Sequence, residues 1–270
     1  MKKTFTTLIL IPIKQIIEKL LEIFFGNGNS YKVRVYRVKK SENLRNTNIP
    51  HSRIFPKATY SPWENDFAFN KVYEVAKEYT MVDEYRMYEL FRLASQAAKL
   101  KGAFLEVGVW RGGSSVIIQA ALDHVAANNK LYIADTFKGV VKAGSTKDTF
   151  YQGGEHADTN VDFVKNLFSK VQKKLPEILV GIFPDDHKVL DIDQLAFLHS
   201  DVDAYESTKG IIEWCLPKMV KGGIIVFDDY GFRGAEGVTE YVNEFLANKF
   251  VSENFHFIHN LNGHAILIKT

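Results

Sequence analysis

Residues 103–115 read Ala-Phe-Leu-Glu-Val-Gly-Val-Trp-Arg-Gly-Gly-Ser-Ser, a short apolar run that leads into glycines and hydroxyl side chains. The apolar run predicts a buried strand over residues 103–109. The glycine pair allows a sharp turn of the backbone, and the residues after it open a predicted helix that continues to His124. The free N–H groups at the start of such a helix can hold a carboxylate or a phosphate. This stretch therefore predicts a ligand-binding turn between a strand and a helix.

The same alternation of strand and helix continues on both sides of this stretch. Further strands are predicted at residues 131–135, 178–183, 195–201 and 223–229, and helices at residues 67–79, 84–99, 208–219 and 235–247. Strands that alternate with helices form a mostly parallel sheet that is covered on both faces. Two last strands, at residues 255–259 and 265–268, flank an Asn-Gly pair, which is a strong hairpin signal. The predicted fold class is therefore α/β, with a mostly parallel seven-stranded sheet and an antiparallel closing hairpin.

The first 60 residues show a different pattern and are predicted to form an N-terminal helical arm ahead of one α/β domain at residues 61–270. Within residues 1–25, apolar side chains recur every three or four positions, which predicts an amphipathic helix. Charged residues interrupt the run, so neither a cleaved signal peptide nor a membrane span is expected. We favour packing on the domain or pairing with a second copy, and therefore expect a homo-oligomer; peripheral membrane contact through residues 1–25 is the alternative. The basic connector at residues 26–60 is interpreted as a solvated loop, with an anion-binding surface as the alternative.

Composition excludes several classes of function. The chain has 46% apolar and 24% charged residues, which is typical of a globular protein. Its formal net charge of +2 is too close to balance to indicate a nucleic-acid partner. Cys215 is the only cysteine, which excludes an internal disulfide and a multi-cysteine metal site. A lone cysteine also favours a reducing compartment, and we expect the protein to be cytoplasmic.

Ligands of a parallel sheet bind beyond the carboxyl ends of its strands. Asp135 ends the second predicted strand, at a distance from the glycine turn that suits a grip on two ribose hydroxyls. The glycine spacing departs from Gly-x-Gly-x-x-Gly, which disfavours a dinucleotide pyrophosphate loop. An NAD-dependent oxidoreductase stays as an alternative. The segment 136–160 is long and polar, and we expect it to be an active-site lid or a disordered stretch.

Three aspartates, Asp201, Asp228 and Asp229, follow two further predicted strands and are expected to meet at one rim of the sheet. Carboxylates so close together repel and raise one another's pKa. A hard divalent cation removes that cost, and oxygen ligands suit Mg²⁺ or Ca²⁺. The alternative is that Asp203 and Asp229 cap the helices that follow them. Capping explains one aspartate at each strand end but not two acidic ends that face each other, so the pattern predicts a metal site.

Four stretches resemble, in order, the motifs of the macrocin O-methyltransferase family, whose members methylate deoxysugars in macrolide and aminocoumarin antibiotics. They lie at residues 106–114, 134–139, 199–208 and 222–231, and the resemblance covers residues 79–270. It implies a class I methyltransferase fold, S-adenosylmethionine and Mg²⁺ as cofactors, and an acceptor that is a sugar-containing small molecule or a glycan. Metal-dependent catechol methyltransferases are the alternative, but they carry an asparagine where Asp229 stands. His187 stands where the family pattern has a small hydroxyl residue, and the arm before residue 67 matches no family motif.

The resemblance also implies residue roles. It places the methionine part of the cofactor against a set of residues in the first motif, namely Glu106, Gly108, Trp110, Arg111, Gly112, Gly113 and Ser114. It places the ribose on Asp135 and the metal on Asp201, Asp228 and Asp229. We predict that Asp201 shares the role of general base, with Asp203 as an outer ligand or base. His199 is a further candidate base, because a histidine can accept a proton near neutral pH. His187 and His156 are interpreted as structural or surface residues.

Overall fold

The computed structural model describes residues 49–51, 58–144 and 146–270. The chain divides into two compact units, residues 1–42 and 43–270, and every described residue belongs to the second. The predicted amphipathic helix of residues 1–25 and most of the basic connector therefore lie outside the described residues. The domain boundary at residue 60 stays a prediction.

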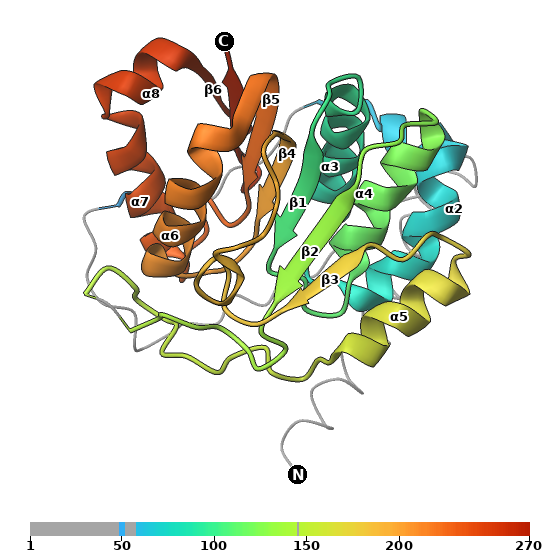
Figure 1. Ribbon diagram of the computed structural model, residues 1–270, viewed down its shortest axis with the longest axis horizontal. Coiled ribbons are helices and arrows are strands. Elements are labelled where there is room, and N and C mark those ends of the chain that lie inside the picture. Colours follow the sequence, from blue (N-terminus) through green and yellow to red (C-terminus); the bar gives the residue numbers. More distant parts are fainter. Residues whose placement is uncertain (1–48, 52–57, 145) are drawn as a thin grey trace, which may run out of the picture. The chain divides into compact units, whose positions relative to one another are not determined.

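Seven strands form one sheet in the order β3-β2-β1-β4-β5-β7-β6 (Figure 1). Their bounds are β1 Ala103–Val107, β2 Leu131–Asp135, β3 Glu177–Val180, β4 Leu195–Ser200, β5 Met219–Phe227, β6 Phe255–His259 and β7 Ala265–Lys269. The five strands from β3 to β5 are parallel to one another. β7 is antiparallel to both β5 and β6. The predicted mostly parallel seven-stranded sheet with an antiparallel closing hairpin is confirmed.

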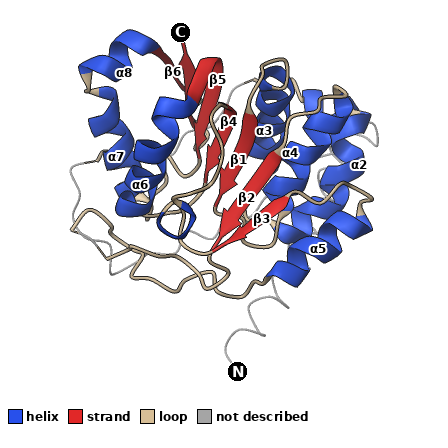
Figure 2. Cartoon of the chain, in the orientation of Figure 1, coloured by secondary structure: helices blue, strands red, loops and turns tan. Residues whose placement is uncertain are grey.

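Helices cover both faces of the sheet (Figure 2). One face carries α2 Phe67–Ala76, α3 Glu84–Ala97, α4 Gly113–His124 and α5 Val161–Lys170. The other face carries α6 Tyr205–Cys215, α7 Glu236–Leu246 and α8 Lys249–Asn254. This three-layer arrangement follows from the alternation of strand and helix, because each crossover returns its helix to one face of the sheet.

The sheet is buried because its central strands are apolar on both sides. Phe104 and Phe197 stack at 5.2 Å between ring centroids and belong to the core on the α2–α5 side. Leu105, Leu198 and Ile225 belong to the core on the α6–α8 side. Full burial of one such side chain contributes about 1.5–3 kcal/mol. These two cores fix the strand register and therefore the position of every residue at the strand ends.

Some boundaries differ from the sequence-based prediction. The helix predicted at residues 208–219 begins earlier, at Tyr205, and ends in a 3-10 turn, η4 (Leu216–Lys218), that contains Pro217. Proline ends a helix because its ring restricts the residue before it. Met219 then already belongs to β5, which starts four residues before the predicted strand.

Two helices were not predicted. α5 begins after Asn160, whose side chain accepts the Phe163 N–H at 3.0 Å. It buries Val164, Leu167 and Phe168, which follow the three- and four-residue spacing of a helix. This capped, amphipathic pattern was present in the sequence. α8, with six residues, is too short for such a pattern to develop.

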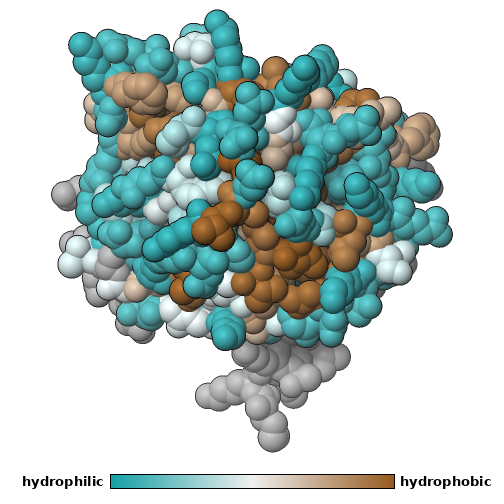
Figure 3. All heavy atoms as spheres, in the orientation of Figure 1, coloured by the Kyte–Doolittle hydropathy of each residue, from teal (hydrophilic) through white to brown (hydrophobic). Residues whose placement is uncertain are grey.

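One face of the described domain shows an apolar area. Figure 3 shows apolar side chains gathered near the edge of the sheet at β3, the strand on which Val180 is 54% exposed. Among the described residues, no helix combines the length and the apolar character that crossing a bilayer requires. The predicted homo-oligomer and the membrane contact of residues 1–25 stay predictions.

Candidate cofactor and metal site

A cleft of about 700 Å³ opens at the carboxyl ends of β1, β2 and β4. The chain runs from β1 outward to β2 and β3 on one side, and to β4 and β5 on the other. The cleft therefore lies at the switch in strand order, where open α/β sheets bind their ligands. Five of the predicted site residues line it, namely Gly108, Trp110, Asp135, Asp201 and Asp203.

Gly108 lets the ends of β1 and β4 approach each other. Its φ of +92° lies in the left-handed region, and a Cβ built there would lie 1.6 Å from the carbonyl oxygen of Asp201. The Asp201 N–H donates to the carbonyl of Val107 at 2.9 Å and extends the pairing of the two strands. Only glycine fits this contact, and the contact brings Asp201 to the cleft.

Asp135 holds the turn after β1 in shape. One carboxylate oxygen accepts the N–H groups of Val109 and Trp110 at 2.7 and 2.8 Å. The other accepts the Phe137 N–H at 2.6 Å. Carboxylate oxygens can accept more than one hydrogen bond each, so Asp135 keeps acceptor capacity toward the cleft that it lines. The position suits the predicted grip on ribose hydroxyls, and it also makes Asp135 a structural residue.

Trp110 and Arg111 form hydrogen bonds with residues near the C-terminal end of the segment 136–160. The Trp110 indole N–H donates to Asp158 at 2.9 Å, and Arg111 donates to the same carboxylate at 2.6 Å. The Thr159 hydroxyl donates to the carbonyl oxygen of Trp110. Arg111 lies over the Trp110 ring, 4.4 Å from its centroid, and does not line the cleft. Arg111 thus meets the loop, and its contact with a cofactor stays a prediction.

The remaining residues of the first motif lie behind the cleft. A Cβ on Gly113 would lie 2.7 Å from Thr80, so this glycine lets the start of α4 pack closely against the residues that follow α2. A Cβ on Gly112 would contact Val164 of α5. Ser114 is buried, and Glu106 is fully buried. These four residues shape the turn and its packing, and none of them lines the cleft.

The three predicted metal ligands converge at the rim of the cleft. Each of Asp201, Asp228 and Asp229 offers a carboxylate oxygen, and these oxygens lie within 4.8 Å of one another. Burial, followed by the charges of the other two, raises the pKa of Asp201 well above its usual range. Burial and then Asp228 and Asp203 raise the pKa of Asp229 in the same way. Two of the three carboxylates are therefore unfavourable as anions without a further cation.

Arg86 of α3 is the cation that the sequence reasoning missed. Its guanidinium lies 2.5 Å from Asp228 and 3.6 Å from Asp229, and it also pairs with Asp83 at 2.9 Å. Burial alone would raise the pKa of Asp228, but Arg86 together with His264 and His199 outweighs it and holds that pKa below its usual range. Burial alone would lower the pKa of Arg86, but the aspartates raise it. An arginine within the apolar face of a predicted helix was the only signal in the sequence.

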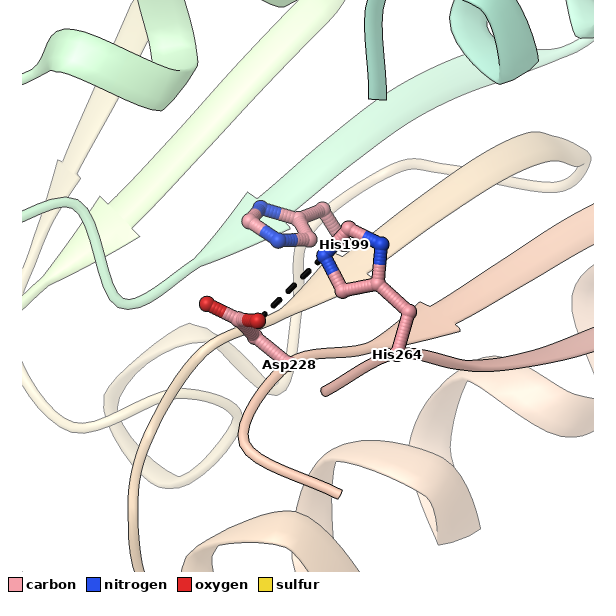
Figure 4. A group of neighbouring side chains, drawn as sticks. All are labelled: His199, Asp228 and His264. Carbon is pink, nitrogen blue, oxygen red and sulfur yellow. Dashed lines mark ion pairs between the residues drawn. The ribbon is translucent and has the colours of Figure 1, made fainter. Parts of the chain in front are cut away.

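Two histidines lie beneath the acidic rim (Figure 4). His264, which directly precedes β7, contacts Glu89 through Nδ1 at 2.6 Å and Asp228 through Nε2 at 3.3 Å. His199 of β4 is fully buried and contacts Glu106 through Nδ1 at 2.8 Å. A general base must reach the proton that it takes. The buried position of His199, away from the lining of the cleft, does not support its predicted role as a base.

The segment 136–160 crosses the cleft as a loop. Apart from residue 145, which is not described, it contains neither helix nor strand. Asp148 is buried and accepts the Tyr205 N–H at 2.9 Å, and the Thr149 hydroxyl donates to the buried Glu236. Burial and the neighbouring Asp203, which its hydroxyl contacts, raise the pKa of Tyr151. The loop is thus pinned to α6 and α7 and places a tyrosine next to the acidic rim.

Comparison with known proteins identifies relatives of this chain. Residues 38–264 match the family model described as macrocin-O-methyltransferase (TylF). The chain is 28% identical over 162 residues to the 8-demethyl-8-(2,3-dimethoxy-alpha-L-rhamnosyl)-tetracenomycin-C 4'-O-methyltransferase of Streptomyces olivaceus, a match that covers 53% of this chain and 62% of that protein. It is 27% identical over 177 residues to the mycinamicin III 3''-O-methyltransferase of Micromonospora griseorubida, covering 60% of this chain and 70% of that protein. The chain thus spans less than two thirds of the first of these relatives.

Solved structures show the same fold. The O-methyltransferase NovP is 25% identical and superposes with a TM-score of 0.61, covering 71% of this chain and 82% of that one. The calicheamicin methyltransferase CalS11 is 17% identical, with a TM-score of 0.55 that covers 81% of this chain and 99% of that one. The predicted class I methyltransferase fold is confirmed by these likenesses together with the strand order.

Proposed function

The chain belongs to the macrocin O-methyltransferase family, and on that premise we propose that it is an S-adenosylmethionine- and Mg²⁺-dependent O-methyltransferase. Its proposed acceptor is a sugar hydroxyl of a glycosylated small molecule or glycan. The observation that carries the proposal is that one cleft joins two features. Asp135 and Asp201 both line it, and Asp228 and Asp229 present carboxylate oxygens within 4.8 Å of an Asp201 oxygen.

The lining of the cleft fits the cofactor in its chemistry. Asp135 offers carboxylate oxygens for two hydroxyls, and the apolar side chains of Val107, Phe183 and Ile211 offer walls for a flat ring. S-adenosylmethionine supplies a methyl group that its sulfonium has already activated for transfer.

The rim fits a hard divalent cation. Asp201, Asp228 and Asp229 present only oxygen donors, and Arg86 compensates the charge of Asp228 more fully than that of the other two. An ion such as Mg²⁺ prefers oxygen ligands of this kind. Bound there, it supplies an electrostatic attraction that orients a neighbouring hydroxyl and lowers the pKa of that hydroxyl. The excess negative charge of the rim supports this part of the proposal.

The residues of the chain then position the acceptor and take its proton. As the hydroxyl oxygen forms its bond to the methyl carbon and the carbon–sulfur bond breaks, the hydroxyl proton must pass to a base. Asp203 lines the cleft and is not one of the three converging carboxylates, so we assign the proton to Asp203, with Asp201 as the second candidate. Exact placement of the reacting groups provides much of the acceleration in such a transfer.

Flat side chains at the cleft support a sugar acceptor. Trp110 lines the cleft, and Tyr151 lies beside Asp203, which also lines it. One of the relatives named above methylates a rhamnosyl-bearing compound, according to its name. An aromatic face beside carboxylates offers a sugar both of the contacts that it needs, to its C–H groups and to its hydroxyls.

Calorimetry tests the cofactor and methyl transfer tests the reaction. We expect S-adenosylhomocysteine to bind the full chain, and Asp135→Asn to weaken binding at least tenfold. Asp162→Asn, on the exposed side of α5, is the matched control and should bind as wild type. With Mg²⁺ present, a panel of deoxysugar-bearing acceptors should gain one methyl group by mass spectrometry. A folded protein that binds NAD⁺ and not S-adenosylhomocysteine would overturn the proposal.

A further inference from the structure

A second group of metal-binding side chains lies directly beneath the acidic rim. His199, Asp228 and His264 each offer one ligand atom, and these atoms lie within 4.8 Å of one another. All three side chains are buried, with 0%, 2% and 0% of their surface exposed. They come from the end of β4, the end of β5 and the start of β7, three neighbouring strands of the sheet. In Figure 4 both imidazole rings lie beside the Asp228 carboxylate.

Carboxylates fix how both histidines are oriented. Nδ1 of His199 contacts the buried Glu106 at 2.8 Å, and Nδ1 of His264 contacts Glu89 at 2.6 Å. A carboxylate accepts a proton-bearing nitrogen, so each Nδ1 is the donor, and loss of any Nε2 proton on metal binding leaves the Nε2 lone pair for the ion. Metal-bound histidines almost always have this arrangement, with the second nitrogen donating to a carboxylate. The same arrangement occurs here twice, around one carboxylate.

His199 Nε2 has no hydrogen-bond partner within the described residues, and His264 Nε2 faces the Asp228 carboxylate. Both Nε2 atoms are fully buried. His264 Nε2 lies 3.3 Å from the Asp228 oxygen. That separation equals the spacing of about 3.3 Å between two ligands of a tetrahedral ion with bonds of about 2.0–2.1 Å. Buried polar atoms without a partner are costly, so an occupant with the right chemistry would stabilise this arrangement.

The local charge also favours a cation. Once a metal has displaced the Nε2 protons, the carboxylates of Glu89, Glu106 and Asp228 have, among the described residues, the Arg86 guanidinium as the cation that pairs with Asp228. A divalent ion balances this excess of negative charge. The ligand set differs from that of the rim above it, because two imidazoles and one carboxylate suit a borderline transition ion rather than Mg²⁺.

We propose that His199, His264 and Asp228 bind a structural divalent transition ion, with Zn²⁺ as the best chemical match. This site is distinct from the three-aspartate rim and shares only Asp228 with it. The ion ties β4, β5 and β7 together beneath the cleft and fixes the Asp228 carboxylate from below. The inference rests on the buried side chains alone and holds whatever the chain methylates.

Cobalt substitution tests this site separately from the rim. Co²⁺ reports imidazole ligation through visible absorption bands that Mg²⁺-type oxygen sites do not intensify. We expect the full-length protein to bind one Co²⁺ with such bands and to exchange it for Zn²⁺. His264→Gln should lose the bands. His256→Gln, on the exposed side of β6, and Asp201→Asn, which removes a rim ligand, should keep them.

A measurement on the wild-type protein removes dependence on variants that fail to fold. Crystals grown with Zn²⁺ should give an anomalous peak at the zinc edge between His199, His264 and Asp228. Density for a water molecule there without an anomalous signal would overturn the proposal, because a water or protonated rings would then satisfy the two Nε2 atoms. Bands that persist in folded His264→Gln protein would overturn it as well.

Discussion

Replacing Gly108 with alanine should separate the ends of β1 and β4. The new Cβ would lie 1.6 Å from the carbonyl oxygen of Asp201, a contact that side-chain rotation cannot relieve because both atoms are fixed to backbone. The left-handed φ of +92° adds its own cost for a residue with a Cβ, about 1–2 kcal/mol. Forcing extra atoms into a packed site costs a further 1–3 kcal/mol, roughly. We therefore expect a loss of about 2–5 kcal/mol in the free energy of unfolding.

Gly154 provides a matched control for the backbone term. Its φ is +86°, and a Cβ added there meets nothing within 4 Å. Gly154→Ala should therefore lose only about 1–2 kcal/mol. Urea denaturation compares the two variants, and calorimetry of S-adenosylhomocysteine and Mg²⁺ measures the displacement of Asp201. Equal stability of the two variants, with unchanged Mg²⁺ binding in Gly108→Ala, would refute the close approach of the two strands.

Three further predictions concern charge, metal and loop. Arg86→Met leaves Asp228 buried without its cation and should lower the free energy of unfolding, measured by urea denaturation, by about 3–5 kcal/mol. Added Mg²⁺ should recover part of this loss. An unchanged denaturation midpoint would contradict the pairing of Arg86 with Asp228. Treatment with EDTA should abolish methyl transfer, measured by mass spectrometry, while S-adenosylhomocysteine still binds in the calorimeter; activity that survives chelation would argue against a metal at the rim. Thr149→Val removes the hydroxyl that donates to buried Glu236, and the free energy of unfolding should fall by about 1–3 kcal/mol. Proteolysis within residues 136–160 should become faster. Cleavage at the wild-type rate would show that this contact does not hold the loop.

The sheet could be predicted because its signals are local. Apolar runs bounded by glycines marked the parallel strands, and the Asn-Gly pair marked the closing hairpin. The three aspartates could be placed together because the carboxyl ends of parallel strands share one edge. Each inference needed only the order of elements along the chain.

The partners of these aspartates could not be predicted, because they are distant in sequence. Arg86 and Asp228 are 142 residues apart, and His264 and Glu89 are 175 residues apart. Helical spacing shows which face of α3 is buried, but it does not show what that face meets. The same limit applies to His199, which lies within an apolar strand and was interpreted as a residue of the site, although its side chain is fully buried.

The negative charges of the three aspartates at the rim are balanced unequally, which suggests that these residues have different roles. Arg86 lies 2.5 Å from Asp228 and, together with His264 and His199, holds the pKa of Asp228 below its usual range. Asp201 and Asp229 receive less compensation from Arg86, and burial beside other carboxylates raises the pKa of each. A protein that needed only stability would gain by replacing one of them with a neutral residue, because facing carboxylates cost free energy. Their presence beside a cleft fits a bound divalent cation, and Asp201→Asn should stabilise the metal-free protein while it weakens Mg²⁺ binding.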